Sequence, residues 1–158
     1  MAFPLPQIER RRIEAAMLGR MYEALCEAMP REQAAAHIEH AVVLDSRAAG
    51  KAFAAAAPDG PSLAHFATVI GRWTEGDALE IDGPHLEGDA LTLTVTRCRY
   101  AEMYRDMGLP APLPYLLSCL RDIHFAAGYS PHLRLDRPTT IALGAGTCPF
   151  RYEWRTEA

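Results

Sequence analysis

"LTLTVTRCRYAEMYRDMG", residues 91–108, changes its hydrophobic period half way along. In its first half leucine and valine alternate with threonine, and this period of two indicates a strand with one buried face. In its second half the pattern is helical, and Gly108 can end that helix in a left-handed conformation. The alternation places Cys98 on the threonine face or at the end of the strand. The stretch therefore predicts a strand that passes directly into a helix, with a thiol at the junction.

A second strand-like segment precedes this stretch. Leu79 and Ile81 alternate with acidic residues, and "DGPHLEGD" at 82–89 has the composition of a turn. Together the two segments predict an antiparallel hairpin.

A helix and further strands are expected after residue 108. "YLLSCLRDIHFAAG" at 115–128 has helical periodicity, and Gly128 is suited to a left-handed cap. Three strand-like segments follow: "HLRLD" at 132–136, "TTIAL" at 139–143 and "TCPFRYEW" at 147–154. The "GAG" between the last two predicts a hairpin turn. In the last segment a cysteine and three aromatic residues alternate onto one face, which predicts a packed face.

The N-terminal half is expected to be helical. Pro30 ends a first helix that starts after Pro6, an alanine-rich helix covers about 31–57, and a third helix carries Phe66 and Trp73. Helices, then a hairpin, then a helix and more strands indicate an α+β fold in which helices cover one side of an antiparallel sheet of about four strands. We expect one domain over 1–158, with a helical part at 1–75 and a motif-bearing part at 76–158.

Composition excludes several classes of function. The 158 residues carry a formal net charge of −4, and the short "ERRR" at 9–12 is not a basic surface of the nucleic-acid-binding kind. No leader-like apolar segment opens the chain, and no apolar run approaches the length that spans a bilayer. A cytoplasmic protein is therefore expected, and its four cysteines should be thiols rather than disulfides.

Cys98, Cys119 and Cys148 lie on three different elements, and Asp122 shares a helix face with Cys119. Three thiols can hold a soft metal such as zinc, with Asp122 or His124 as a further ligand. They can instead supply a nucleophile if one thiol pKa is lowered, or fill core volume. The sequence has no C-x-x-C motif, so the spacing of the cysteines does not distinguish these three roles. His37 and His40 have helical spacing, but no third ligand lies near them in sequence, so a solvated helix face is favoured.

Several anchors in the C-terminal half resemble the L-2-amino-thiazoline-4-carboxylic acid hydrolase family. They start with "CRYAEM" and "CLRD", continue with a proline before a strand and "RPTT", and end with "GAGTCPFRY". The matching residues are Cys98, Tyr100, Ala101, Glu102, Cys119, Asp122, Pro131, Arg137, Thr140, Gly144, Cys148, Phe150, Arg151 and Tyr152.

The ending also resembles ligand-binding domains of the four-vinyl-reductase type. Those domains pack helices against an antiparallel sheet and have cysteines that can bind zinc. Where such zinc sites carry a glutamate and a cysteine, this chain carries Arg137 and Thr140. A zinc site here would therefore need Cys98 as a ligand.

The hydrolase resemblance implies that water opens the ring of a small cyclic amidine and leaves an N-carbamoyl amino acid. Asp122 is the candidate base, and Cys119, Cys98 and Cys148 are the other candidate catalytic residues. For Cys98, the start of the following helix should lower the thiol pKa. A substrate carboxylate needs a cation, and Arg137 is preferred over Arg151. Tyr100 and His124 complete the expected substrate-binding set.

Two hypotheses on function follow. The first is a hydrolase that breaks a carbon–nitrogen or carbon–sulfur bond in a small heterocycle, with no certain cofactor and with zinc or another divalent metal as an option. The second is a non-catalytic module that binds a small ligand or zinc. The expected partner is a small-molecule substrate, and the alanine-rich helix could also pack against a second copy of the chain.

Overall fold

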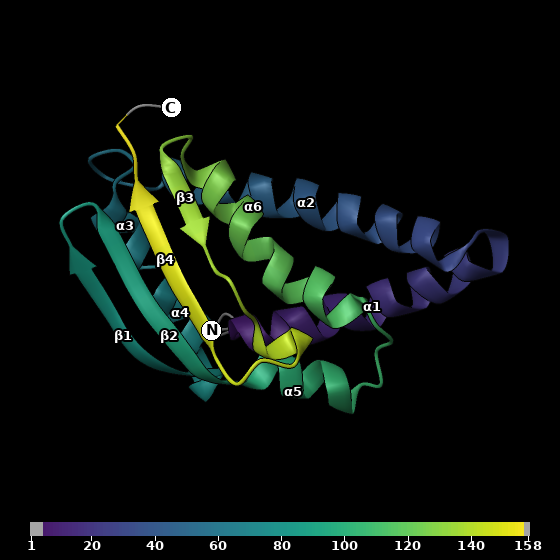
Figure 1. Ribbon diagram of the computed structural model, residues 1–158. Helices are drawn as coiled ribbons and strands as arrows, with labels where there is room; N and C mark the ends of the chain where they lie inside the picture. The colour runs from purple at the N-terminus through teal and green to yellow at the C-terminus, as the bar shows by residue number, and fades with distance from the viewer. Residues whose placement is uncertain (1–4, 157–158) are drawn as a thin grey trace.

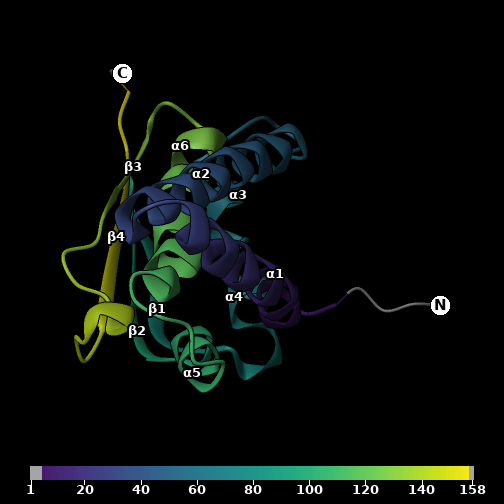
Figure 2. The same ribbon diagram turned by 90° about the vertical axis from the view of Figure 1, so that its right-hand side faces the viewer.

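The computed structural model describes residues 5–156. Its helices gather on one face of a four-stranded antiparallel sheet, and two long helices extend beyond the sheet (Figure 1). Figure 2 shows the same layers edge-on, with α6 between the sheet and α2. The predicted α+β class is confirmed, whereas the likeness to four-vinyl-reductase-type domains stays a prediction.

Prolines set the starts of the two long helices. Helix α1 (Gln7–Ala28) follows Pro6, and α2 (Arg31–Ala55) follows Pro30. A proline lacks the N–H that the first helical turn would leave unpaired, so it suits both positions. The predicted end of the first helix at Pro30 is confirmed.

The predicted third helix is wrong in one respect, because it is broken in two. Helix α3 (Leu63–Ala67) is capped by Ser62, whose hydroxyl accepts from the His65 backbone N–H at 3.1 Å. Helix α4 (Ile70–Thr74) follows, and a 3₁₀ turn, η1 (Glu75–Asp77), leads to the sheet.

The sheet has the order β1-β2-β4-β3, and all neighbouring strands are antiparallel. Strands β1 (Leu79–Glu87) and β2 (Ala90–Cys98) form the predicted hairpin. A bulge in β2 shifts the register, because Ile81 pairs with Val95 while Glu80 pairs with Arg97. This irregularity reverses the alternation beyond it. Of the two positions expected for Cys98, the threonine face is therefore wrong and the end of the strand is confirmed, where the thiol packs on the apolar, helix-covered face.

The predicted strand-to-helix junction is confirmed. Cys98 is both the last residue of β2 and the N-cap of α5 (Arg99–Asp106), and Gly108 follows that helix with a positive φ of 68°. The next helix starts as a π-helical turn, η2 (Tyr115–Cys119), and continues as α6 (Leu120–Tyr129).

Gly128 does not end α6, contrary to the prediction. The helix runs on to Tyr129, and Gly128 keeps an ordinary negative φ. A Cβ at Gly128 would collide with the backbone of Arg47 in α2, and one at Gly50 would collide with the backbone of α6 at Phe125. Each glycine therefore allows the two helix backbones to touch at their crossing.

The C-terminal region has one strand fewer than its sequence pattern suggests. Strands β3 (Leu133–Asp136) and β4 (Cys148–Trp154) are present, but "TTIAL" contains a 3₁₀ turn, η3 (Ile141–Leu143), instead of a strand. The predicted hairpin turn at the glycines is also wrong, because Gly144 caps η3 at a φ of 95° within the β3–β4 connection. The predicted packed face of β4 is confirmed by the burial of Cys148, Phe150 and Tyr152.

Two apolar clusters form the core. One joins the inner face of the sheet to α3, α4 and α6, and the other joins α1, α2, α5 and the start of α6. Cys98 and Leu79 contact both clusters. No helix within residues 5–156 combines the length and the apolar character needed to cross a bilayer.

Candidate functional site

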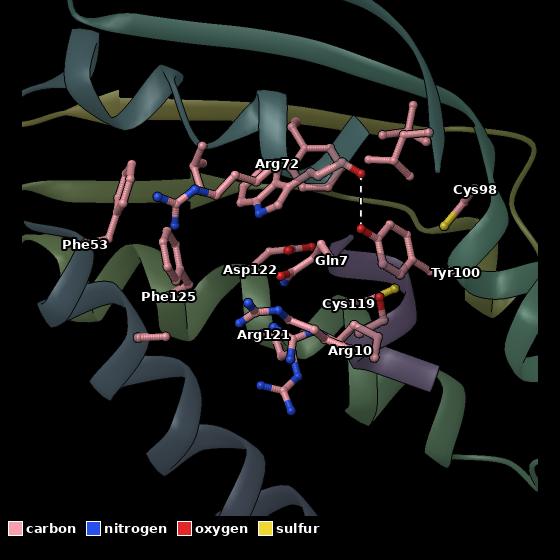
Figure 3. A pocket seen from close by; sticks show the side chains of 18 of the residues that line it. Gln7, Arg10, Phe53, Arg72, Cys98, Tyr100, Cys119, Arg121, Asp122 and Phe125 are labelled. Carbon is pink, nitrogen blue, oxygen red and sulfur yellow. Dashed lines mark hydrogen bonds between the residues drawn. The ribbon is translucent and has the colours of Figure 1, made fainter. Parts of the chain in front are cut away.

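A cavity of about 480 Å³ lies between the inner face of the sheet and the helices. Side chains from α1, α2, α4, β2, α5, α6 and β4 border it (Figure 3). Six residues singled out in the sequence are among them: Cys98, Tyr100, Cys119, Asp122, Arg137 and Cys148. The three thiols and the carboxylate of Asp122 therefore share one cavity.

Asp122 and Arg137 form an ion pair at the cavity wall. Arg137 donates through Nη1 to Oδ2 of Asp122 and through Nη2 to the Cys119 carbonyl at 2.8 Å, and its guanidinium lies 5.1 Å from the centre of the Phe150 ring. The Arg137 side chain is only 3% exposed, whereas Asp122 is 23% exposed. Arg137 is thus fixed by its neighbours, while the carboxylate faces the cavity.

Burial changes the acidity of Asp122 more than its partner does. Removal from water disfavours the carboxylate form and raises the pKa of Asp122 to about 6, although Arg137 acts in the opposite direction. At neutral pH most Asp122 side chains are therefore ionised, yet far more basic than an ordinary aspartate. Oδ1 has no hydrogen-bond partner within residues 5–156, so it can accept a proton from a ligand or a water molecule.

Two of the thiols act as hydrogen-bond acceptors for backbone groups. The Cys98 sulfur accepts from the Ala101 N–H at 3.4 Å and so caps α5. The Cys148 sulfur accepts from the Ile141 N–H at 3.1 Å and ties η3 to the start of β4. Both contacts hold a sulfur that borders the cavity against a neighbouring backbone N–H group.

The three cavity thiols are less acidic than a free cysteine. Burial raises the pKa of Cys98 to about 11, and the backbone hydrogen bond from Ala101 offsets only part of this effect. Burial and the charge of Asp122 raise the pKa of Cys119 to about 12, and burial also raises the pKa of Cys148. The first backbone N–H groups of α5 do lower the Cys98 pKa as expected, but burial raises it by more, so the net shift is opposite to the predicted one.

The donor set does not fit a metal ion. Within residues 5–156, no three histidine, cysteine, aspartate or glutamate side chains converge closely enough to hold one. The sulfurs of Cys98 and Cys148 instead face backbone N–H groups, and Asp122 is paired with Arg137. These residues therefore do not support a zinc site.

Two residues singled out in the sequence lie outside the cavity. Arg151 is on the opposite face of β4, 51% exposed, where its Nε donates to Glu153 at 2.8 Å. His124 does not border the cavity either, and burial together with the charge of Arg47 in α2 lowers its pKa. The expected roles of both residues in substrate binding therefore lose their geometric basis.

The sequence patterns did not reveal the cationic side of the cavity. Arg10 and Arg11 of α1, Arg72 of α4 and Arg121 of α6 all border it. Arg121 is 9% exposed and joins three helices, because it pairs with Asp45 at 2.5 Å and with Glu14 at 3.3 Å. These arginines come from distant parts of the chain, so only the tertiary fold brings them together.

Arg10 and Arg72 differ from the other cavity arginines in their partners. Neither has a carboxylate within ion-pair distance in the part of the chain that the structure describes. Arg10 donates only to the Leu5 carbonyl at 3.3 Å, and the Arg72 guanidinium lies 5.4 Å from the centre of the Phe53 ring. Both cations are therefore available to an anionic ligand.

Comparison with known proteins supports the resemblance found in the motifs. The family model described as L-2-amino-thiazoline-4-carboxylic acid hydrolase matches residues 10–152. A search of curated proteins gave no match. The match starts within α1 and ends within β4, so it includes every residue that borders the cavity except Gln7. This chain belongs to the L-2-amino-thiazoline-4-carboxylic acid hydrolase family.

Proposed function

We propose that this protein hydrolyses a cyclic amidine that carries a carboxylate, with ring opening as in the conversion of 2-aminothiazoline-4-carboxylate to N-carbamoylcysteine. Membership of the family supports a hydrolase. The observation that carries the proposal is the environment of Asp122, a carboxylate of raised pKa that faces a cavity with a free oxygen. A base whose pKa lies near the working pH is well suited to activate water.

The proposed reaction consumes one water molecule. Oδ1 of Asp122 takes a proton as the water oxygen bonds to the ring carbon between nitrogen and sulfur. Addition moves the electron pair of the carbon–nitrogen double bond onto the ring nitrogen, which takes the remaining proton of the attacking water as the carbonyl forms. In this collapse of the tetrahedral intermediate the carbon–sulfur bond breaks, and the sulfur leaves with its electron pair. The proton held by Asp122 passes to that sulfur, which regenerates the carboxylate and gives the free thiol of the product.

Arg137 acts in this scheme as a positioning residue. Its guanidinium donates to Oδ2 of Asp122, so Oδ1 remains directed to the reacting water. Its other donated hydrogen bond goes to the Cys119 carbonyl, and this role replaces the expected clamp on the substrate carboxylate. Arg10 and Arg72, which have no carboxylate partner, supply the attraction for that group.

The cysteines serve the proposed reaction as neutral groups. With thiol pKa values near 11 and 12, roughly one Cys98 or Cys119 in a thousand or fewer is a thiolate at pH 7.5. Direct attack by sulfur is therefore disfavoured relative to water activation by Asp122. Through their backbone contacts, Cys98 holds the start of α5 and Cys148 holds η3.

The test is hydrolysis of 2-aminothiazoline-4-carboxylate by the purified protein, followed by release of the product thiol and by the mass of the carbamoyl product. The wild-type protein should release one thiol per substrate. Asp122→Asn should lower kcat by about 100-fold or more, since general base catalysis contributes at least this much. Asp82→Asn, an exposed carboxylate outside the cavity, is the matched control and should leave kcat unchanged.

Binding without turnover would contradict the proposal. If calorimetry detects the compound in the wild-type cavity while no thiol is released, the non-catalytic binding module becomes the better description. An Asp122→Asn variant with normal turnover would contradict the assigned base.

A further inference from the structure

The cavity is larger than an aminothiazoline ring requires. An engineered protein cavity of roughly 150 Å³ accepts benzene, and the cavity here is about 480 Å³. A single five-membered ring with a carboxylate would therefore leave much of the space empty. Cavities of this size typically enclose a ligand with more than one ring.

One end of the cavity is aromatic. Figure 3 shows Asp122 near the middle of the cavity, Tyr100 and Cys98 to one side, and Phe53 and Phe125 to the other. The Phe53 and Phe125 rings are 5.7 Å apart, and Trp73 meets Phe125 edge-on with 6.3 Å between ring centres. The Arg72 guanidinium lies 5.4 Å from the centre of the Phe53 ring. Three aromatic rings and a planar cation are typical walls for a flat aromatic group.

Helix α2 keeps this end of the cavity open. Ala49, Ala52 and Ala56 border the cavity on the same helix face as Phe53. Each of the three is exposed although it faces a cavity, so the wall is formed by methyl groups where longer side chains would fill the space. The aromatic end is thus bordered by rings, methyl groups and the Arg72 guanidinium, and it opens to solvent along α2.

We propose that the substrate of this protein carries an aromatic substituent, and that this group binds against Phe53, Phe125 and Trp73 while the amidine ring lies at Asp122. This inference rests on the function proposed above and narrows its substrate class to aryl-bearing cyclic amidine carboxylates. Burial of a phenyl group against aromatic side chains strengthens binding, because it removes apolar surface from water and adds ring-to-ring contacts.

The experiment compares three probes by calorimetry and by turnover. They are 2-aminothiazoline-4-carboxylate, its derivative with a benzyl group on ring carbon 5, next to the carbon that carries the carboxylate, and a derivative with a hydroxypropyl group at the same position. The benzyl compound should bind at least tenfold more tightly than both others. The hydroxypropyl compound controls for added size without aromatic character.

Two variants at exposed positions of α2 test whether the benzyl group binds at the aromatic end of the cavity. Ala52→Phe places a ring in the aromatic end and should remove at least tenfold of the affinity for the benzyl compound, with a much smaller change for the unsubstituted one. Ala48→Phe is the matched control, because Ala48 is exposed on the same helix and does not border the cavity. It should change neither affinity.

The outcomes separate this inference from the proposed function. A benzyl preference that Ala52→Phe abolishes supports the aromatic subsite, whether or not the protein turns the probes over. Equal affinity for the three probes, or a preference that Ala52→Phe leaves intact, overturns it. Thiol release alone decides the hydrolase proposal.

Discussion

At the scale of single residues, the charge state of Asp122 should control the pH dependence of hydrolysis. The pKa of Asp122 is raised to about 6 by burial, and the base must be ionised to accept a proton from water. We therefore expect kcat/KM to rise about tenfold per pH unit below pH 6 and to level off above it. Initial rates between pH 4.5 and 8.5 measure this limb. If kcat/KM levels off near pH 4 instead, the Asp122 carboxylate is not desolvated.

Arg137 should determine the pH at which kcat/KM levels off. The guanidinium stabilises the ionised carboxylate, so its removal should raise the Asp122 pKa further. In Arg137→Gln the limb should move to higher pH by about one unit or more, since an adjacent cation typically has an effect of this size. Arg137→Lys keeps the charge and should leave the limb close to its wild-type position.

A structural role alone would predict a different result. If Arg137→Gln lowers kcat and the melting temperature while the limb stays in place, Arg137 supports the fold without tuning Asp122. Thermal unfolding of both variants separates the two cases.

The cavity thiols should react slowly with alkylating reagents at neutral pH. Because burial raises the pKa of Cys98 to about 11 and that of Cys119 to about 12, very little thiolate is present to attack iodoacetamide. Peptide mass mapping of partly alkylated native protein should show little label at either residue at pH 7.5, and an increase at pH 10. Rapid alkylation of Cys119 at pH 7 would restore the nucleophilic alternative.

Residue types and motif anchors in the sequence singled out one acid, three thiols and a first-choice arginine that all border one cavity, and their roles there stay predictions. They could not indicate that Arg137 is paired with Asp122, since that contact joins α6 to the loop after β3. They also misplaced Arg151, although strand alternation already separated it from its neighbours Phe150 and Tyr152. In that case the alternation along β4 predicts the position of Arg151 correctly, whereas the family anchor does not.

At the scale of elements, the crossing of α2 and α6 depends on Gly50 and Gly128. A methyl group at Gly128 would collide with the Arg47 backbone, so the two helices would have to separate. Gly128→Ala should therefore lower the free energy of unfolding by about 2 kcal/mol or more, the usual cost of overpacking. Chemical denaturation measures this difference.

The matched control is Gly71→Ala in α4. A Cβ at Gly71 meets nothing within 4 Å, and alanine favours a helix over glycine. Stability should be unchanged or slightly raised. If Gly128→Ala were equally harmless, the backbone contact between α2 and α6 would not be as close as the structure has it.

The sequence predicted the boundaries of helices and strands correctly where neighbouring residues alone determine them. The prolines before α1 and α2, the hairpin and the junction at Cys98 are all examples. The errors arose where tertiary contacts override local preference. "TTIAL" has strand composition, but its Ile141 N–H donates to the Cys148 sulfur, and a 3₁₀ turn results. The bulge in β2 has no signature in the alternation of leucine and threonine, so the face of Cys98 was assigned incorrectly.

At the scale of the whole molecule, the charge of the cavity is opposite to that of the chain. The protein carries a formal net charge of −4, yet five arginines and three carboxylates border the cavity. An anionic substrate is therefore repelled by the molecule as a whole and attracted at the cavity. Such a local attraction is screened as salt increases.

Arg72 allows this attraction to be tested, because it borders the cavity without a carboxylate partner in the described part of the chain. In Arg72→Gln the KM for 2-aminothiazoline-4-carboxylate should rise about fivefold or more with little change in kcat, the pattern expected when uniform binding is lost. The wild-type KM should rise with salt between 20 and 500 mM, and the rise should be smaller in the variant. Arg151→Gln removes the same charge from the far face of the sheet, so its KM and salt dependence should match the wild type. Equal effects of the two substitutions would mean that net charge, and not the cation beside Phe53, governs substrate binding.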